Sequence, residues 1–210
     1  MITELYLEQL KTWEQTGKHI LAQYDDNSII VYQAYRPSIA EYAIKHQKFG
    51  GDFKLTRMSW IKPNFLWMMY RCGWATKEGQ EYVLGIRLTK TFFDEILRSA
   101  VVSSFEKSDF ENRETWQQAV DTSDVRLQWD PDHDPLGNQV ERRAVQLGLR
   151  GDILRRYAEQ EILEIIDMTP FVIEQRQHLD NDFEKLIIPK ETLYIPNDEQ
   201  AIKSVGIDRK

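Results

Sequence analysis

The sequence predicts a single α+β domain, in which helices flank a mainly antiparallel or mixed sheet. Segments typical of strands and of helices alternate along the 210 residues without the regular period of a doubly wound parallel sheet. The length suits one sizeable hydrophobic core, and no shift in composition, repeat or low-complexity tract marks a domain boundary. We therefore expect one domain over residues 1–210.

The first elements are predicted from hydrophobic spacing and from residues that start or end helices. Residues 3–16 carry apolar side chains at roughly helical spacing and are followed by Gly17, which is typical of a helix end. Residues 29–35 are β-branched and aromatic, and predict a strand. Pro37 suits the first turn of the next helix, where its missing N–H costs nothing.

The middle of the chain continues this alternation. Residues 65–72 are good helix formers that follow Pro63, so Lys62 and Asn64 are expected at the helix entrance. Asn112 is placed to cap a later helix. The further predicted elements are a strand over 82–88, helices over 92–100 and 114–120, strands over 125–129 and 143–149, and a proline-rich loop over 130–135.

The last third of the chain is expected to hold one long helix and a hairpin. From Gly151 to Ile166 the apolar residues follow a helical pattern, which Pro170 ends. Two short apolar runs follow over 186–188 and 193–195. The prolines beside them indicate a hairpin at the edge of a sheet.

Composition and charge restrict the classes of function. No apolar run approaches the roughly 20 residues that cross a bilayer, and the N-terminus does not look like a secretion signal, so we expect a cytoplasmic protein with no membrane partner. One cysteine, Cys72, cannot form an internal disulfide or a cysteine metal cluster. The net charge of −7 argues against indiscriminate nucleic-acid binding, although residues 126–156 are locally cationic.

Familiar catalytic signatures are absent from the sequence. It contains no phosphate loop, no dinucleotide glycine fingerprint, no nucleophile elbow and no zinc-protease helix. Common nucleotide hydrolases and zinc proteases are therefore not expected. The turn from Gly148 to Gly151 precedes a predicted helix, and is either an ordinary strand-to-helix turn or a set of N–H donors for a phosphate.

Residues 57–74 form the most distinctive segment. They hold three of the six tryptophans, three of the five methionines and the only cysteine, together with three cations. A hydrophobic core explains the tryptophans. The polar residues of the segment are costly to bury without anionic or carbonyl partners, and are therefore either on the surface or in the wall of an anion-binding pocket. They are Arg57, Lys62, Asn64 and Arg71.

The acidic loop over 130–141 offers weaker acid and base candidates. Its carboxylates are spaced like the ligands of an EF-hand calcium loop, but Pro135 occupies the position that needs glycine for a sharp turn. We therefore expect no metal site and interpret the loop as a solvated turn. Neighbouring carboxylates would tend to raise the pKa of its histidine. The weaker candidates are Asp130, Asp132, His133 and Glu141.

Several stretches carry a resemblance to a known family. They are residues 31–40 (VYQAYRPSIA), 57–75 (RMSWIKPNFLWMMYRCGWA), 128–132 (QWDPD) and 143–149 (RAVQLGL). These stretches resemble the DUF4291 family, whose name records a domain of unknown function. The resemblance implies a family core over about residues 20–169, followed by a C-terminal helix and hairpin extension over 170–210. It carries over no catalytic residues.

A more distant likeness is to the ADP-ribosyltransferase fold. An early aromatic strand followed by a helix and a glycine-bearing turn resembles the opening of that fold. The resemblance implies that Tyr32 and Tyr35 stack on a nicotinamide or adenine ring, with NAD as a candidate cofactor. It also implies that Arg57 or Arg71 holds a pyrophosphate. Gly148 stands where those enzymes carry the catalytic acid, so no catalytic residue is carried over.

The sequence leaves three hypotheses for function. In the first, the protein is an enzyme acting on a nucleotide or nucleic-acid phosphate. The candidate ligand-binding residues are Tyr32, Gln33 and Arg36 on one wall and Arg57, Lys62 and Arg71 on the other, with Tyr35 and Asn64 beside them. In the second, it is a non-catalytic RNA-binding or protein-binding module with aromatic platforms and a basic stretch over 142–156. In the third, the aromatic residues are all core and the polar residues only cap helices.

Overall fold

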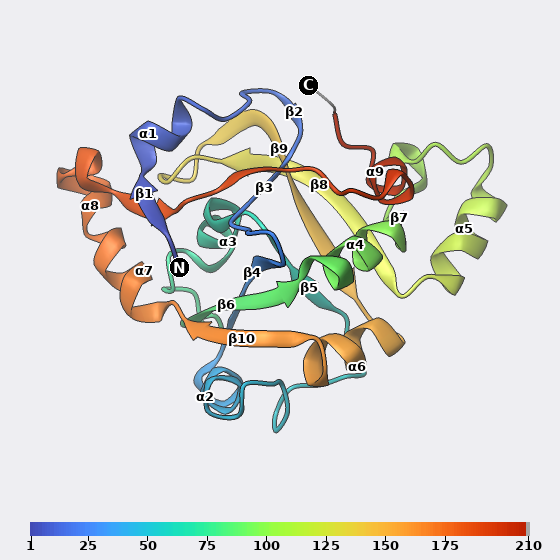
Figure 1. Ribbon diagram of the computed structural model, residues 1–210, viewed down its shortest axis with the longest axis horizontal. Helices are drawn as coiled ribbons and strands as arrows, with labels where there is room; N and C mark the ends of the chain where they lie inside the picture. Colours follow the sequence, from blue (N-terminus) through green and yellow to red (C-terminus); the bar gives the residue numbers. More distant parts are fainter. Residues whose placement is uncertain (209–210) are drawn as a thin grey trace.

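One part of the fold is a three-stranded antiparallel sheet (Figure 1). The computed structural model describes residues 1–208 and places the strands in the order β10 (Ile162–Asp167), β6 (Tyr82–Thr89) and β4 (Ser28–Tyr35). β4 and β6 pair along their whole lengths. Ser28 lies opposite Thr89 at one end of the ladder, and Tyr35 lies opposite Tyr82 at the other. The strand predicted over residues 29–35 is confirmed, as its β-branched and aromatic residues suit a pleated surface buried on both sides.

A second, mixed sheet is built on the long antiparallel hairpin of β8 (Val125–His133) and β9 (Gln139–Leu149). β7 (Ala100–Val102) runs parallel to β8, and β2 (Gly17–Lys18) runs parallel to β9. β5 (Ser59–Ile61) pairs antiparallel with the last residues of β9. Helices surround both sheets in Figure 1, so the predicted α+β class with a mixed sheet is confirmed.

Two short ladders join the N-terminal and C-terminal parts of the chain. β1 (Thr3–Leu5) pairs with β11 (Ile187–Pro189), and β3 (Ile20–Ala22) pairs with β12 (Thr192–Tyr194). The predicted late hairpin is therefore wrong. The two residues between β11 and β12 carry the chain from one N-terminal strand to the next instead of reversing its direction.

The helices cover the faces and ends of the sheets (Figure 1). They are α1 (Tyr6–Leu10), α2 (Pro37–His46), α3 (Phe65–Cys72), α4 (Lys90–Arg98), α5 (Arg113–Thr122), α6 (Gly151–Glu159), α7 (Thr169–Arg176), α8 (His178–Asn181) and α9 (Glu199–Val205), with single 3₁₀ turns at Phe105–Lys107 and Phe183–Lys185. The predicted helix starts at Pro37, Asn64 and Asn112 are confirmed. The side chains of both asparagines accept a hydrogen bond from the backbone N–H three residues later, as N-caps do.

Three predicted elements are wrong in type or length. The helix expected over residues 3–16 is a short strand and a five-residue helix. The helix expected from Gly151 to Ile166 stops at Glu159, because the following residues pair with β6 as β10. The apolar spacing of such a short run fits a helix face as well as a strand, so spacing alone does not separate the two. The loop expected over residues 130–135 instead continues β8 as far as His133.

β4 separates two hydrophobic clusters, because its successive side chains point to opposite sides of the sheet. Ile29 and Val31 belong to the larger cluster, which joins both sheets to α4 and α6. Ile30 and Tyr32 belong to the smaller cluster, which is built around α3. The same alternation places Gln33 on the side of Ile29 and Val31, at the end of the strand where the candidate site lies.

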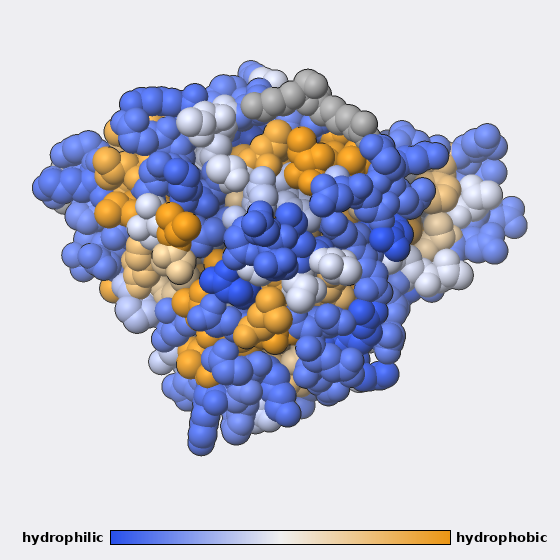
Figure 2. Space-filling view, viewed as in Figure 1, coloured by the Kyte–Doolittle hydropathy of each residue, from blue (hydrophilic) through white to orange (hydrophobic). Residues whose placement is uncertain are grey.

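The surface is mostly hydrophilic on the face that Figure 2 shows, where hydrophobic side chains form several separate patches. Exposed apolar residues such as Ile2, Leu136 and Leu163 lie on different elements of the fold. Scattered exposure of this kind is ordinary for a folded domain. None of the described helices has the length and apolar content needed to cross a bilayer.

Candidate functional site

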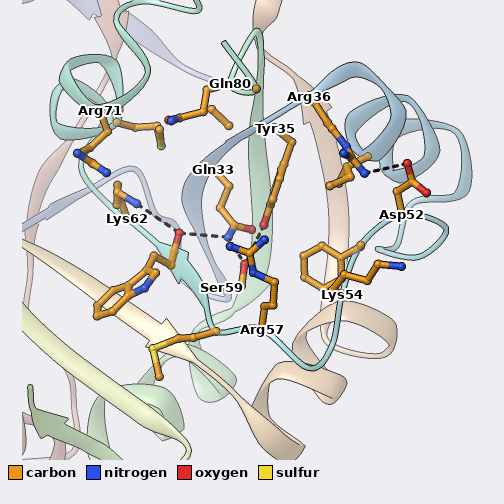
Figure 3. Close-up of a pocket in the computed structure, with 17 residues that line it drawn as sticks. Gln33, Tyr35, Arg36, Asp52, Lys54, Arg57, Ser59, Lys62, Arg71 and Gln80 are labelled. Carbon is orange, nitrogen blue, oxygen red and sulfur yellow. Dashed lines mark hydrogen bonds and ion pairs between the residues drawn. The ribbon is translucent and has the colours of Figure 1, made fainter. Parts of the chain in front are cut away.

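A cavity of about 650 Å³ opens at the C-terminal end of β4 (Figure 3). Its wall comes from residues 33–39 of β4 and α2, from residues 52–60 leading into β5, and from one side of α3 with the turn before β6. The predicted site residues that line it are Gln33, Tyr35, Arg36, Arg57, Lys62 and Arg71. The predicted residues around 33–36 and around 57–71, which are separate in sequence, therefore line one space.

β5 fixes the position of Lys62, because it bridges the two sheets. Its three residues pair with the end of β9, opposite Leu147 to Leu149. The next residue, Lys62, exchanges two backbone hydrogen bonds with Tyr32 of β4. The backbone of Lys62 is thus held by the first sheet immediately after β5 leaves the second.

Gly148 of β9 makes room for the segment that forms this wall. A Cβ atom at Gly148 would lie 2.6 Å from Met58 Sδ and 3.0 Å from the nearest atoms of the Trp60 ring. Met58 and Trp60 both line the cavity. A side chain at position 148 would therefore displace Met58 and Trp60 in the cavity wall, which gives this glycine a packing role.

Hydrogen bonds between four polar side chains hold one wall of the cavity in place. Gln33 Nε2 donates to Ser59 Oγ at 2.8 Å and to the Trp60 carbonyl at 3.1 Å. The hydroxyl of Tyr157, from α6, donates to Gln33 Oε1 at 2.6 Å. The hydroxyl of Tyr35 lies 2.8 Å from Ser59 Oγ. Both ends of the Gln33 amide have partners, so its orientation is fixed.

Lys62 is only 5% exposed, although it lines the cavity. Its Nζ donates one hydrogen bond, to the Trp60 carbonyl at 3.3 Å, and forms no ion pair with any residue that the structure describes. Burial, helped by the Arg71 guanidinium and opposed by the Asp130 carboxylate, lowers the pKa of Lys62 from 10.5 to about 8. A large share of Lys62 is therefore a neutral amine in mildly alkaline solution.

The other cations of the cavity are exposed. Lys54, Arg57 and Arg71 form no ion pair within residues 1–208. Arg36 differs, because its guanidinium lies 3.0 Å from Asp52 Oδ2. Asp52 is the one acidic side chain among the described lining residues, so five cations, counting the buried lysine, face a single carboxylate. The cavity has a surplus of positive charge.

Two of the predicted ligand-binding residues do not line this cavity. Tyr32 is fully buried and packs edge-on against Phe65, with ring centroids 5.4 Å apart. Asn64 caps α3 through a 2.7 Å bond from the Trp67 N–H, and its Nδ2 donates to the buried carboxylate of Glu191 at 3.0 Å. Both residues make structural contacts in the interior and are not among the residues that line the cavity.

The carboxylates of the predicted acidic loop also lie outside the cavity lining. Asp130 accepts a hydrogen bond from Gln146 at 2.7 Å. Asp132 is buried and forms an ion pair with Arg142, whose Nη2 lies 2.6 Å from its Oδ2. Glu141 is exposed on β9. Within the described part of the chain, no group of His, Cys, Asp and Glu side chains is arranged to hold a metal ion.

His133 is part of an aromatic stack. Its ring lies 3.5 Å from that of Tyr70 and 5.3 Å from that of Trp67, nearly parallel to both. Burial lowers the pKa of His133 and outweighs the opposing effect of the neighbouring carboxylates. The carboxylates raise this pKa as expected, but burial has the larger effect, so the net shift is downward.

Several residues of the cavity and its surroundings carry no distinctive signal in the sequence. Ser59 and Lys54 lie in or next to the aromatic segment, but a serine and a lysine there carried no distinctive pattern. Tyr157 lies in α6, more than a hundred residues from Gln33 in sequence, and only the fold brings the two together. No signal in a single sequence identifies that contact.

The fold and the site together define an α+β protein with a cation-lined cavity between its sheets and α3. The chain belongs to the DUF4291 family, described as a domain of unknown function, whose family model matches residues 19–194. The match extends through β12, so it includes the C-terminal strands that pair with the start of the chain. The chain has no significant match among curated protein sequences.

Proposed function

We propose that the cavity binds the phosphate groups of a nucleotide or a nucleic acid, and that the protein is an enzyme acting on such a ligand. The observation that carries the proposal is the presence of Arg57, Lys62 and Arg71 around one space without a carboxylate partner. Clustered cations repel one another, and a buried one is costly unless it is paired. An anionic ligand supplies the missing partner. Guanidinium groups suit phosphate because they bind its oxygens through paired hydrogen bonds.

The size and aromatic lining of the cavity support a nucleotide rather than a simple ion. Its volume of about 650 Å³ falls within the range of small-molecule sites. Tyr35, Phe53 and Trp60 line it and offer ring faces or edges to a base. NAD is one candidate ligand, in keeping with the resemblance to the ADP-ribosyltransferase fold.

The alternative of an RNA-binding surface has less support from the basic stretch over residues 142–156. Arg142 is buried against Asp132, and Arg155 lies 3.4 Å from Asp152. Arg156 is paired with two carboxylates, which face it from α4 and from the start of the segment leading to β10. These arginines already have anionic partners, whereas Lys54, Arg57, Lys62 and Arg71 of the cavity have none within residues 1–208.

Isothermal titration calorimetry with ADP, ATP, NAD and ADP-ribose tests the proposal. We expect at least one of them to bind the wild-type protein, and Arg71→Gln to weaken that binding by about tenfold or more. Lys45→Gln removes an exposed cation from α2 outside the cavity and serves as the matched control, which should bind as the wild type does.

Two results would count against the proposal. One is the absence of binding by all four ligands to a protein shown to be folded. The other is binding of short RNA with a steep salt dependence that Arg71→Gln leaves unchanged, which would favour the RNA-binding alternative.

A further inference from the structure

We infer that Lys62 forms an imine with a ligand that carries a phosphate and a free aldehyde or ketone. This inference rests on the proposed phosphate-binding function and deepens it, because it assigns the chemistry of a second group on the same ligand. Imine formation needs a neutral amine that a ligand can reach from solution but that is shielded from bulk water. Lys62 meets this need better than any other lysine that lines the cavity.

The surroundings of the Lys62 amine favour its neutral form. Three hydrogens on an ammonium group need three acceptors, but within residues 1–208 the one acceptor of Nζ is the Trp60 carbonyl. After loss of a proton, the amine still donates to this carbonyl and keeps a lone pair free. Figure 3 shows Lys62 and Arg71 reaching into the cavity from the same side, and the positive charge of Arg71 also disfavours a second cation.

The other charged or titratable groups near Lys62 do not reverse this effect. Asp130 stabilises the protonated amine from a distance but forms no ion pair with it. Cys72 is a buried thiol whose pKa burial raises, so it carries little negative charge. With a pKa of about 8 instead of 10.5, the neutral fraction at pH 8 rises from roughly 0.3% to about half, a gain of about 150-fold.

The remaining cations supply the anchor for the phosphate. Arg57 and Arg71 are free to bind it, and Lys62 lies in the same lining. Holding the phosphate raises the local concentration of the carbonyl group beside the amine, which converts a bimolecular encounter into an intramolecular step. A ligand with the carbonyl alone lacks that advantage.

The reaction balances without any other reagent. The Lys62 nitrogen attacks the carbonyl carbon, and the electron pair of the C=O bond moves to oxygen, which takes up a proton. The resulting carbinolamine loses its hydroxyl group as water, and the C=N bond forms. One amine and one carbonyl give one imine and one water, with nothing oxidised or reduced.

Pyridoxal 5′-phosphate is a suitable probe, because it combines an aldehyde with a phosphate. The folded protein is incubated with less than one equivalent, reduced with borohydride and mapped by peptide mass spectrometry. We expect Lys62 to be modified before any other lysine, and ADP in excess to lower the labelling by about tenfold or more. Pyridoxal, which lacks the phosphate, should label Lys62 at least tenfold less.

Lys54 provides the matched control, because it lines the same cavity but is exposed. Lys54→Arg should keep the labelling of Lys62, and Lys62→Arg should abolish it while preserving a cation. Even if Lys62→Arg does not fold, the wild-type protein tests the inference, because its peptide map shows which lysine is labelled first.

Preferential labelling of Lys54 or of lysines outside the cavity, with Lys62 unmodified, overturns the inference. Equal labelling of Lys62 by pyridoxal and by its phosphate also overturns it, since the anion site then has no part in the reaction. If calorimetry shows ADP binding while Lys62 stays unmodified, the inference fails and the proposed phosphate-binding function stands. If no nucleotide or phosphate binds, both fail.

Discussion

Tyr32 and Lys62 exchange two backbone hydrogen bonds across the gap between the sheets. The Tyr32 N–H donates to the Lys62 carbonyl at 2.6 Å, and the Lys62 N–H donates to the Tyr32 carbonyl at 3.2 Å. Their side chains have different surroundings, because Tyr32 packs in the smaller hydrophobic cluster and Lys62 lines the cavity. The pair fixes Lys62 beside the cavity through backbone contacts alone, so the side chain at position 62 can be changed without breaking them.

Nucleotide affinity is expected to fall as the pH rises through about 8. Burial lowers the pKa of Lys62 to about 8, so this residue is a cation below that pH and a neutral amine above it. Loss of one charge should weaken ADP binding by about tenfold between about pH 7 and pH 9. Calorimetry across this range measures the effect. Lys62→Arg should bind with little pH dependence, and an equal pH dependence in this variant would assign the effect to another group.

Replacing Lys62 by methionine should stabilise the fold while weakening nucleotide binding. The folded-state pKa lies below the unfolded value, so burial of the charged amine destabilises the protein at pH 7, and this cost is relieved as the pH rises above about 8. Methionine fills a similar volume, and Gln33 still donates to the Trp60 carbonyl. We expect a gain of about 1–3 kcal/mol in the free energy of unfolding by urea denaturation. A loss of stability would show that the amine has stabilising contacts.

Asn64→Ala should reduce stability but leave nucleotide affinity nearly unchanged. Asn64 caps α3 and donates to the buried carboxylate of Glu191, so its removal leaves two buried groups without a partner. We expect a loss of about 2–4 kcal/mol. Asn112→Ala removes an exposed cap of α5 and should cost only about 1 kcal/mol. A selective loss of ligand binding in Asn64→Ala, with stability retained, would instead place Asn64 in the site.

Asp132→Asn should be strongly destabilising. Asp132 and Arg142 are both almost fully buried, so neutralising one leaves an uncompensated charge in the interior. Removal of one partner of such a pair costs about 3–5 kcal/mol. Asp152→Asn breaks an exposed pair with Arg155 and should change the free energy of unfolding by less than about 0.5 kcal/mol. Similar losses in the two variants would contradict the assigned role of burial.

Tyr157→Phe should lower both stability and ligand affinity. The variant removes the donor to Gln33 Oε1 and leaves a buried acceptor unpaired, at a cost of about 1–3 kcal/mol. Gln33 lines the cavity, and without the Tyr157 hydroxyl its amide is no longer held in one orientation. ADP binding should therefore also weaken several-fold. Tyr24→Phe is the control, since the Tyr24 hydroxyl donates to the Leu193 carbonyl at an exposed position. Unchanged ADP binding in Tyr157→Phe would mean that Gln33 has no part in the site.

Local sequence signals predicted the elements that carry the site. The strand at β4 follows from its β-branched and aromatic residues, and α3 from the good helix formers that follow Pro63. Signals of this kind act within a few residues. They do not show that β11 pairs with β1, or that the isoleucines after Glu159 join β6, because those contacts depend on distant partners.

The candidate site was predictable in part for the same reason. The cation-rich segment around Lys62 stood out by composition, and the alternation of β4 separates the direction of Tyr32 from that of Gln33 and Tyr35. Composition does not show that Asn64 faces the interior. The contact with Tyr157 depends on how α6 packs against the end of β4, which no local pattern encodes.

The pairing of β1 with β11 and of β3 with β12 has a consequence for biosynthesis. The ribosome makes the first strands long before their partners, which lie near residues 187–194. Until those residues emerge, the start of the nascent chain has unpaired strand edges and exposed apolar side chains, which favour aggregation. Slow translation should therefore leave this protein dependent on chaperones until residues 187–194 have left the ribosome.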